Sequence, residues 1–180
     1  MHMTGAWILL IFAVLTTAVM LLLLHLTRLG DVVHTRLPDR PRRRLFVASV
    51  SFFITFLGVR LLVAAITHHI GPFGWVTFGG RHIHHLVWGI LILLAVGYAW
   101  LAEVGTGSSP YSIFLSRLLA ILYGVGAALT LDEFALWLNL ANVYWSPQGR
   151  ESIDAVILFG AALSAGAWGA PLFIALKRKH

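Results

Sequence analysis

The stretch THHIGPFGWVTFGGRHIHHLVW, residues 67–88, contains five of the nine histidines and joins two long apolar runs. Neutral imidazole binds transition metals, and its protonation changes between roughly pH 5 and 8. Each flanking run is long enough to cross a bilayer, so the stretch predicts a histidine-rich junction between two membrane spans. The junction indicates a metal or proton site at one end of a helical bundle. Its histidines are His68, His69, His82, His84 and His85.

The composition of the 180 residues is typical of a protein immersed in lipid. Hydrophobic residues make up 59% and charged residues only 11%, with a mean hydropathy of +0.86, whereas soluble domains carry about 25% charged residues. Too few polar groups remain to cover a water-facing surface. The absence of cysteine excludes disulfides, thiolate zinc sites and cysteine nucleophiles. We expect an all-α, polytopic integral membrane protein that forms a single domain over residues 1–180.

Five apolar segments predict a bundle of about five transmembrane helices. Arginine is concentrated in residues 28–44, and the chain ends in a second basic run. By the positive-inside rule these segments face the cytoplasm, which puts the N-terminus outside and the C-terminus in the cytoplasm of a multi-pass plasma-membrane protein. The N-terminal run lacks the basic n-region of a signal peptide and is interpreted as a retained span. The predicted spans cover residues 5–27, 45–67, 82–102, 113–138 and 152–176.

Charged residues inside the predicted spans lie at a common depth. Arg60 lies about 10 Å below the outer end of its span, and Asp132 and Glu133 lie at nearly the same level. A charge near the bilayer centre costs roughly 2.5–3.5 kcal/mol, so these groups are expected to be partners. An ion pair from Arg60 leaves one carboxylate as a metal ligand or general base. Asp154, at the same end, is a further candidate ligand, or a partner for its own helix dipole.

The histidine spacing favours a metal centre held by imidazole and carboxylate. His82 and His85 are three residues apart and share a face if helical, whereas His68 and His69 diverge by about 100°. His84 is expected to point towards Trp88. Imidazoles with carboxylates suit zinc or iron, although interfacial histidines bonded to water are the ordinary alternative. The expected metal ligands are His82, His85, His68, His69, His84 and Asp154, and the expected catalytic residues are Glu133 and Asp132.

Several functions are compatible with this pattern. The leading hypothesis is a membrane-embedded enzyme that uses a divalent transition metal, as a lipid-directed hydrolase or an oxidoreductase. The alternatives are a proton or metal-ion transporter or sensor, a haem-binding electron carrier and a structural subunit of a membrane complex. The inner halves of the spans contain few polar groups, which disfavours a conduit. The H-E-x-x-H pattern of zinc proteases and the three histidine boxes of membrane desaturases are both missing.

The expected partners follow from the same features. The lipid bilayer surrounds the bundle, and a lipid is the expected substrate of an outer-end site. The basic loop is interpreted as a topology determinant and not as a nucleic-acid site. Assembly as a homo-oligomer or within a membrane complex is compatible with the sequence.

Overall fold

The computed structural model describes residues 39–72, 74, 77–78, 81–141 and 146–177, together with residues 11, 14–15, 17–22, 33 and 37. For residues 77–78, 81–82, 148, 165 and 168–177 it describes the backbone alone. The predicted span at residues 5–27 therefore lies mostly outside the described residues.

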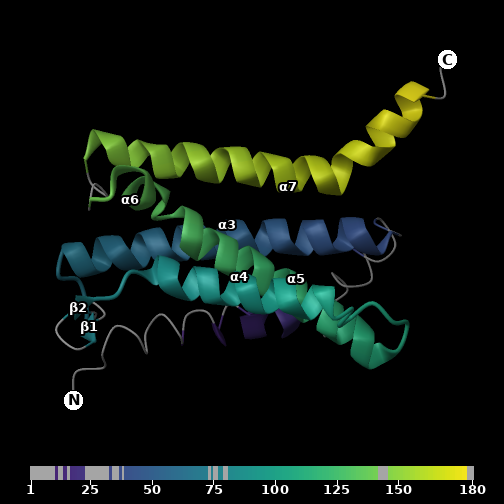
Figure 1. Ribbon diagram of the computed structural model, residues 1–180, viewed down its shortest axis with the longest axis horizontal. Helices are drawn as coiled ribbons and strands as arrows, with labels where there is room; N and C mark the ends of the chain where they lie inside the picture. Colours follow the sequence, from purple (N-terminus) through teal and green to yellow (C-terminus); the bar gives the residue numbers. More distant parts are fainter. Residues whose placement is uncertain are drawn as a thin grey trace.

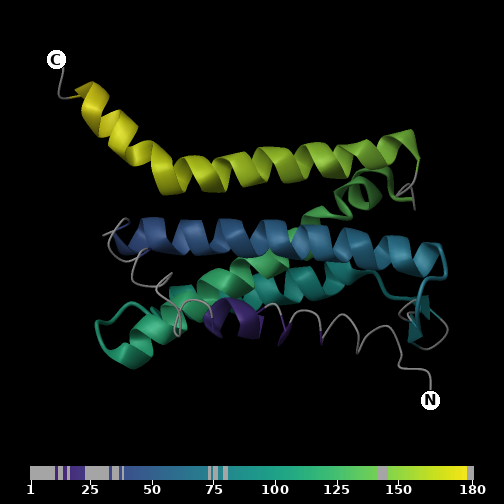
Figure 2. The same ribbon diagram turned by 180° about the vertical axis from the view of Figure 1, so that it is seen from behind.

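Helices dominate the described chain, and four long ones form the bundle in Figures 1 and 2. Helix α5 packs between α3 and α4, and α7 packs along α3. A two-residue antiparallel β-ladder precedes α4, with Thr77 opposite His82. In chain order the elements are α3 (Arg40–Thr67), β1 (Thr77–Phe78), β2 (Arg81–His82), α4 (His85–Leu101), α5 (Pro110–Leu131), α6 (Phe134–Asn139), η1 (Pro147–Gly149) and α7 (Arg150–Lys177).

The bundle has two chemically different ends. At one end α3 finishes, α4 begins, and α5 passes into α6; we call this the carboxylate end (Figure 1). At the other end α3 begins beside the loop that joins α4 to α5; we call this the arginine end (Figure 2). In that loop Ser109 caps α5 by accepting a hydrogen bond from Ser112 N at 3.1 Å, and Pro110 occupies the first helical turn.

Two of the described helices, α3 and α5, are long and apolar enough to cross a membrane by length and composition. Helix α4 is a shorter apolar helix of 17 residues. The prediction of a span beginning at residue 82 is wrong, because His82 belongs to β2 and the helix starts at His85. His82 and His85 therefore share no helical face.

The predicted span at residues 113–138 is divided between two helices. Helix α5 ends at Leu131, Asp132 and Glu133 form a turn, and α6 restarts at Phe134. Both carboxylates at the turn bond to groups on neighbouring helices. These charge-assisted contacts offset the backbone hydrogen bonds that an uninterrupted helix would have made.

Small residues bring the helices together between the two ends. A Cβ atom at Gly124 of α5 would overlap Ser51 Oγ and Ala48 O of α3. A Cβ atom at Gly89 of α4 would overlap the Thr130 hydroxyl of α5. Such contacts are typical of closely packed membrane helices. The helices therefore pack closely at these two positions, one along the middle of α5 and the other about one turn from the carboxylate end.

Candidate functional site

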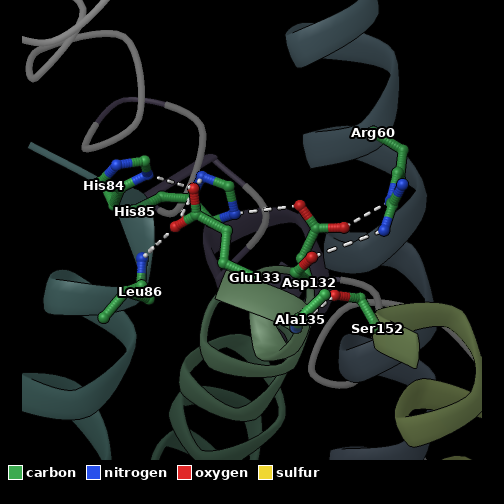
Figure 3. Close-up of polar contacts among 8 residues, drawn as sticks. All are labelled: Arg60, His84, His85, Leu86, Asp132, Glu133, Ala135 and Ser152. Carbon is green, nitrogen blue, oxygen red and sulfur yellow. Dashed lines mark hydrogen bonds and ion pairs between the residues drawn. The ribbon is translucent and has the colours of Figure 1, made fainter. Parts of the chain in front are cut away.

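Two consecutive carboxylates are buried at the break between α5 and α6. Asp132 is 0% exposed and Glu133 is 6% exposed. Burial of an ionised carboxylate is costly unless the group is paired and hydrogen-bonded. Figure 3 shows that the two side chains diverge from the break, one towards α3 and the other towards the start of α4. The break therefore presents each carboxylate to a different set of partners.

Asp132 joins three helices. Arg60 of α3 donates through Nε to Asp132 Oδ1, and its NH2 group lies 3.4 Å from the main-chain oxygen of the same residue. His85 Nε2 of α4 lies 2.9 Å from Asp132 Oδ2. Both carboxylate oxygens thus have a partner (Figure 3). An aspartate at a helix C-terminus opposes the helix dipole, and the Arg60 guanidinium offsets this cost.

Glu133 binds the first turn of α4. His84 Nδ1 lies 2.6 Å from Glu133 Oε1, and the Leu86 amide donates to Oε2 at 3.0 Å. Because the first amides of a helix have no intrahelical acceptor, a carboxylate there satisfies a donor and complements the dipole. Glu133 therefore fixes the start of α4 against the break in α5.

His85 lies between the two carboxylates. Its Nε2 atom faces Asp132, and its Nδ1 atom lies 3.6 Å from Glu133 Oε2. The ring is only 6% exposed. Imidazole donates from both nitrogens only when it is protonated. With Arg60 at +1 and two ionised carboxylates at −2, one protonated histidine makes the network neutral. The geometry therefore places one buried imidazole between two buried carboxylates.

The structure brings together some of the predicted site residues and leaves others apart. His84, His85, Asp132, Glu133 and Arg60 form one network, which we call the carboxylate network. His84 bonds Glu133, although the sequence pattern pointed it towards Trp88. The other three predicted ligands with described side chains are exposed and have no described contact with the network: His68, His69 and Asp154. The side chain of His82 lies outside the described residues.

Two members of the site were not predicted from the sequence. Ser152, 2% exposed on α7, accepts a hydrogen bond from the Ala135 amide at 2.9 Å and so supports the restart at α6 (Figure 3). The Leu86 amide is a main-chain donor, and no residue type signals it. Ser152 could have been noticed only as a small polar residue near the predicted start of the last helix.

The described residues contain no group of three or more His, Cys, Asp or Glu side chains arranged to hold a metal ion. In the carboxylate network, the donor atoms of the histidines face the carboxylates directly. An open hollow of about 380 Å³ lies beside His84. Its walls are mostly apolar and come from α6 and the residues after it: Leu136, Trp137, Leu140 and Ala141.

Comparison with protein-family models, curated proteins and solved structures finds no match for this chain. The geometry of the carboxylate network is therefore the main basis for a functional argument.

Proposed function

We propose that the chain is a multi-pass plasma-membrane protein with five spans, an outer N-terminus and a cytoplasmic C-terminus. Two features support this placement besides the apolar length of α3 and α5. Large apolar side chains point away from the bundle along the helices, among them Leu57, Leu61 and Leu94, which are 60–66% exposed. Arginine gathers at one end of the bundle, the end that the positive-inside rule assigns to the cytoplasm. The carboxylate end then faces the outer side.

Within this membrane protein we propose that the carboxylate network is a proton sensor. The observation that carries the proposal is the position of His85, whose two ring nitrogens face two different buried carboxylates. Histidine is the side chain whose charge ordinarily changes between roughly pH 5 and 8. Protonated His85 donates to Asp132 Oδ2 at 2.9 Å, faces Glu133 Oε2 at 3.6 Å as a charge and not as a hydrogen-bond donor, and neutralises the network. Its proton therefore controls a contact between α4 and the α5–α6 break.

Loss of that proton has a defined structural consequence. One ring nitrogen becomes an acceptor that faces a carboxylate oxygen, and the buried network acquires a net negative charge. Both effects weaken the attachment of the first turn of α4 to Asp132 and Glu133. The protonated state is thus the closed state, and rising pH releases α4 from the break. A two-state element of this kind, biased by histidine protonation, is the usual basis of a pH switch.

The packing below the network favours sensing over conduction. Gly124 packs closely against Ser51 and Gly89 packs closely against Thr130, which brings α5 into contact with α3 and α4 among the described residues. The Ser51 hydroxyl has only main-chain oxygens as described acceptors: Val47 O at 2.9 Å and Ala48 O at 3.1 Å in α3, and Ile121 O at 3.2 Å in α5. We therefore propose that proton binding at His85 changes the conformation of this end and does not pass the proton along the bundle.

The proposal is tested by the distance between α4 and α6 as a function of pH. The chain contains no cysteine, so spin labels can be placed at Val87→Cys on α4 and Leu138→Cys on α6, both exposed positions. We expect the distance or its spread to increase as the pH is raised across the range in which the protein stays folded. His85→Gln should abolish that dependence, while His69→Gln, an exposed histidine at the same end, should retain it. An unchanged distance in the wild type across this range would contradict the proposal.

A metal-dependent membrane enzyme is the second candidate. The observation that favours it is the meeting of His84, His85 and Glu133 beside an apolar hollow that would accommodate part of a lipid. Zinc or iron there would replace the histidine–carboxylate contacts, and a carboxylate would serve as base towards a lipid ester. It ranks second because Arg60 already neutralises Asp132.

Metal content distinguishes the two candidates. The enzyme hypothesis predicts stoichiometric zinc or iron in the wild type and in His34→Ala, and its loss in His85→Ala, after identical purification without a histidine tag. Equal metal in all three proteins, or none in the wild type after metal loading, would eliminate the enzyme and leave the sensor.

A further inference from the structure

The arginine end concentrates positive charge from two helices. The start of α3 contributes Arg40, Arg42, Arg43 and Arg44, and α5 contributes Arg117. All five side chains are half-buried. We call this group the arginine cluster.

Most described hydrogen bonds of the cluster go to uncharged acceptors. Arg44 donates through Nε to Ser116 Oγ at 2.7 Å and through NH2 to Gly105 O at 2.8 Å. Arg40 donates to Thr106 O in the same loop, and Arg43 donates to a main-chain carbonyl, Leu37 O, at 3.3 Å. The bonds to Gly105 and Thr106 hold the α4–α5 loop against α3, and none of the four acceptors brings a negative charge to the arginines.

Among the described residues, the charge balance of this end is positive. Of the seven acidic residues in the chain, four lie in or after the α5–α6 break, at the carboxylate end, and Asp31 lies outside the described residues. Asp39 and Glu103 remain, and only Asp39 forms a described ion pair, with Arg42 at 3.3 Å. Arg43 is repelled by Arg40 and Arg117 and attracted by Asp39.

The position of the cluster at the start of α3 adds to this imbalance. The N-terminus of a helix carries a partial positive charge, and basic residues in the first turn oppose it. The first turn of α3 contains no acidic residue, and Asp39 at the N-cap position is the one carboxylate described at this helix end. A bound anion would relieve both the repulsion among the arginines and the unfavourable dipole. Arginine is well suited to phosphate because its planar donors match two oxygens at once.

We propose that the arginine cluster binds the phosphate of an anionic phospholipid headgroup. The lipid source is favoured because the apolar part of α3 begins directly after Arg44, with Leu45 and Phe46. The Trp100 ring lies 6.0 Å from the Arg44 guanidinium carbon, an arrangement typical of the membrane–water interface. Arg43 and Arg117 approach the phosphate from different helices, while Arg40 and Arg44 hold the loop.

The test is lipid binding to the full-length chain in detergent, followed by native mass spectrometry and thermal unfolding. We expect phosphatidylglycerol to bind at least about tenfold more tightly than phosphatidylcholine and to raise the unfolding temperature. Arg43→Gln and Arg117→Gln should each remove most of that preference. Arg150→Gln, an exposed arginine at the opposite end, should retain it.

Each result of this experiment decides a specific point. Equal stabilisation by phosphatidylcholine, or full phosphatidylglycerol binding by both glutamine variants, would overturn the site. Equal stabilisation by inorganic phosphate at matched concentration would overturn the lipid source. Should Arg43→Gln fail to purify, Arg117→Gln decides once its unfolding temperature without lipid matches that of the wild type, which separates lost lipid binding from lost stability. The result is independent of pH sensing, because the cluster shares no residue with the carboxylate network.

Discussion

The two ends of the bundle each contain an arginine–aspartate pair, and the pairs differ mainly in burial. Arg60 and Asp132, at the carboxylate end, have side chains that are 20% and 0% exposed. Arg42 and Asp39, at the arginine end, have side chains that are 18% and 56% exposed. Water can solvate Asp39 when its partner is lost, but it cannot reach Asp132. We therefore expect the arginine–aspartate ion pair to contribute strongly to stability at the carboxylate end and weakly at the arginine end.

The largest expected contrast between the two ends is their accessibility from opposite sides of the membrane. Single cysteines at Gly74→Cys, near the carboxylate end, and Ser108→Cys, in the loop at the arginine end, report on the two sides. A membrane-impermeant thiol reagent applied to intact cells should label the first and spare the second. Labelling of Ser108→Cys alone would reverse the proposed topology, and labelling of both would remove the membrane separation.

Removal of the buried aspartate should produce the largest loss of stability. Asp132→Asn leaves the Arg60 charge and the His85 ring without their anionic partner, and loss of one member of a buried pair costs about 3–5 kcal/mol. The free energy of unfolding in detergent measures the loss. Asp154→Asn, at an exposed position on α7, is the matched control and should be neutral. A similar cost at both positions would show that burial is not the cause.

A double-mutant cycle should identify the partner of Arg60. Arg60→Gln combined with Asp132→Asn should cost less than the sum of the single changes, with a coupling of about 0.5–3 kcal/mol. Arg60→Gln combined with Glu133→Gln should show weaker coupling, because Glu133 bonds to α4 and not to α3. Equal coupling for both carboxylates would contradict the division of partners seen in Figure 3.

The smallest effect is expected at the exposed pair. Asp39→Asn should change the free energy of unfolding by at most about 1 kcal/mol, since exposed ion pairs are weak and screened by salt. The small change should shrink further at high ionic strength. A cost as large as that of Asp132→Asn would show that the arginine end depends on its ion pair for structure.

Part of the carboxylate network could be predicted from the sequence. Arg60, Asp132 and Glu133 lie at one level along apolar segments, and an intramembrane charge needs a partner, so the sequence places them together. The argument from the spacing of His82 and His85 was wrong, because α4 begins only at His85. The i, i+3 argument for His82 and His85 assumed a helix that begins three residues too early.

The break after Leu131 could not be predicted from the sequence, for a related reason. The sequence of an apolar segment does not reveal a helix break when contacts from other helices replace the helix's own hydrogen bonds. Asp132 and Glu133 make such contacts. The Leu86 amide and the Ser152 hydroxyl illustrate the same limit, because main-chain donors and long-range caps depend on tertiary position.

The proposed proton sensor depends on the protonation of His85, which ¹⁵N side-chain NMR of the histidines can observe. Over the pH range in which the protein stays folded, we expect both ring nitrogens of His85 to carry protons at the acidic end and one of these protons to be lost as the pH rises. That change should coincide with the altered distance between α4 and α6. A His85 ring that retains one bare nitrogen at every pH in this range, with no change on titration, would contradict the proton sensor.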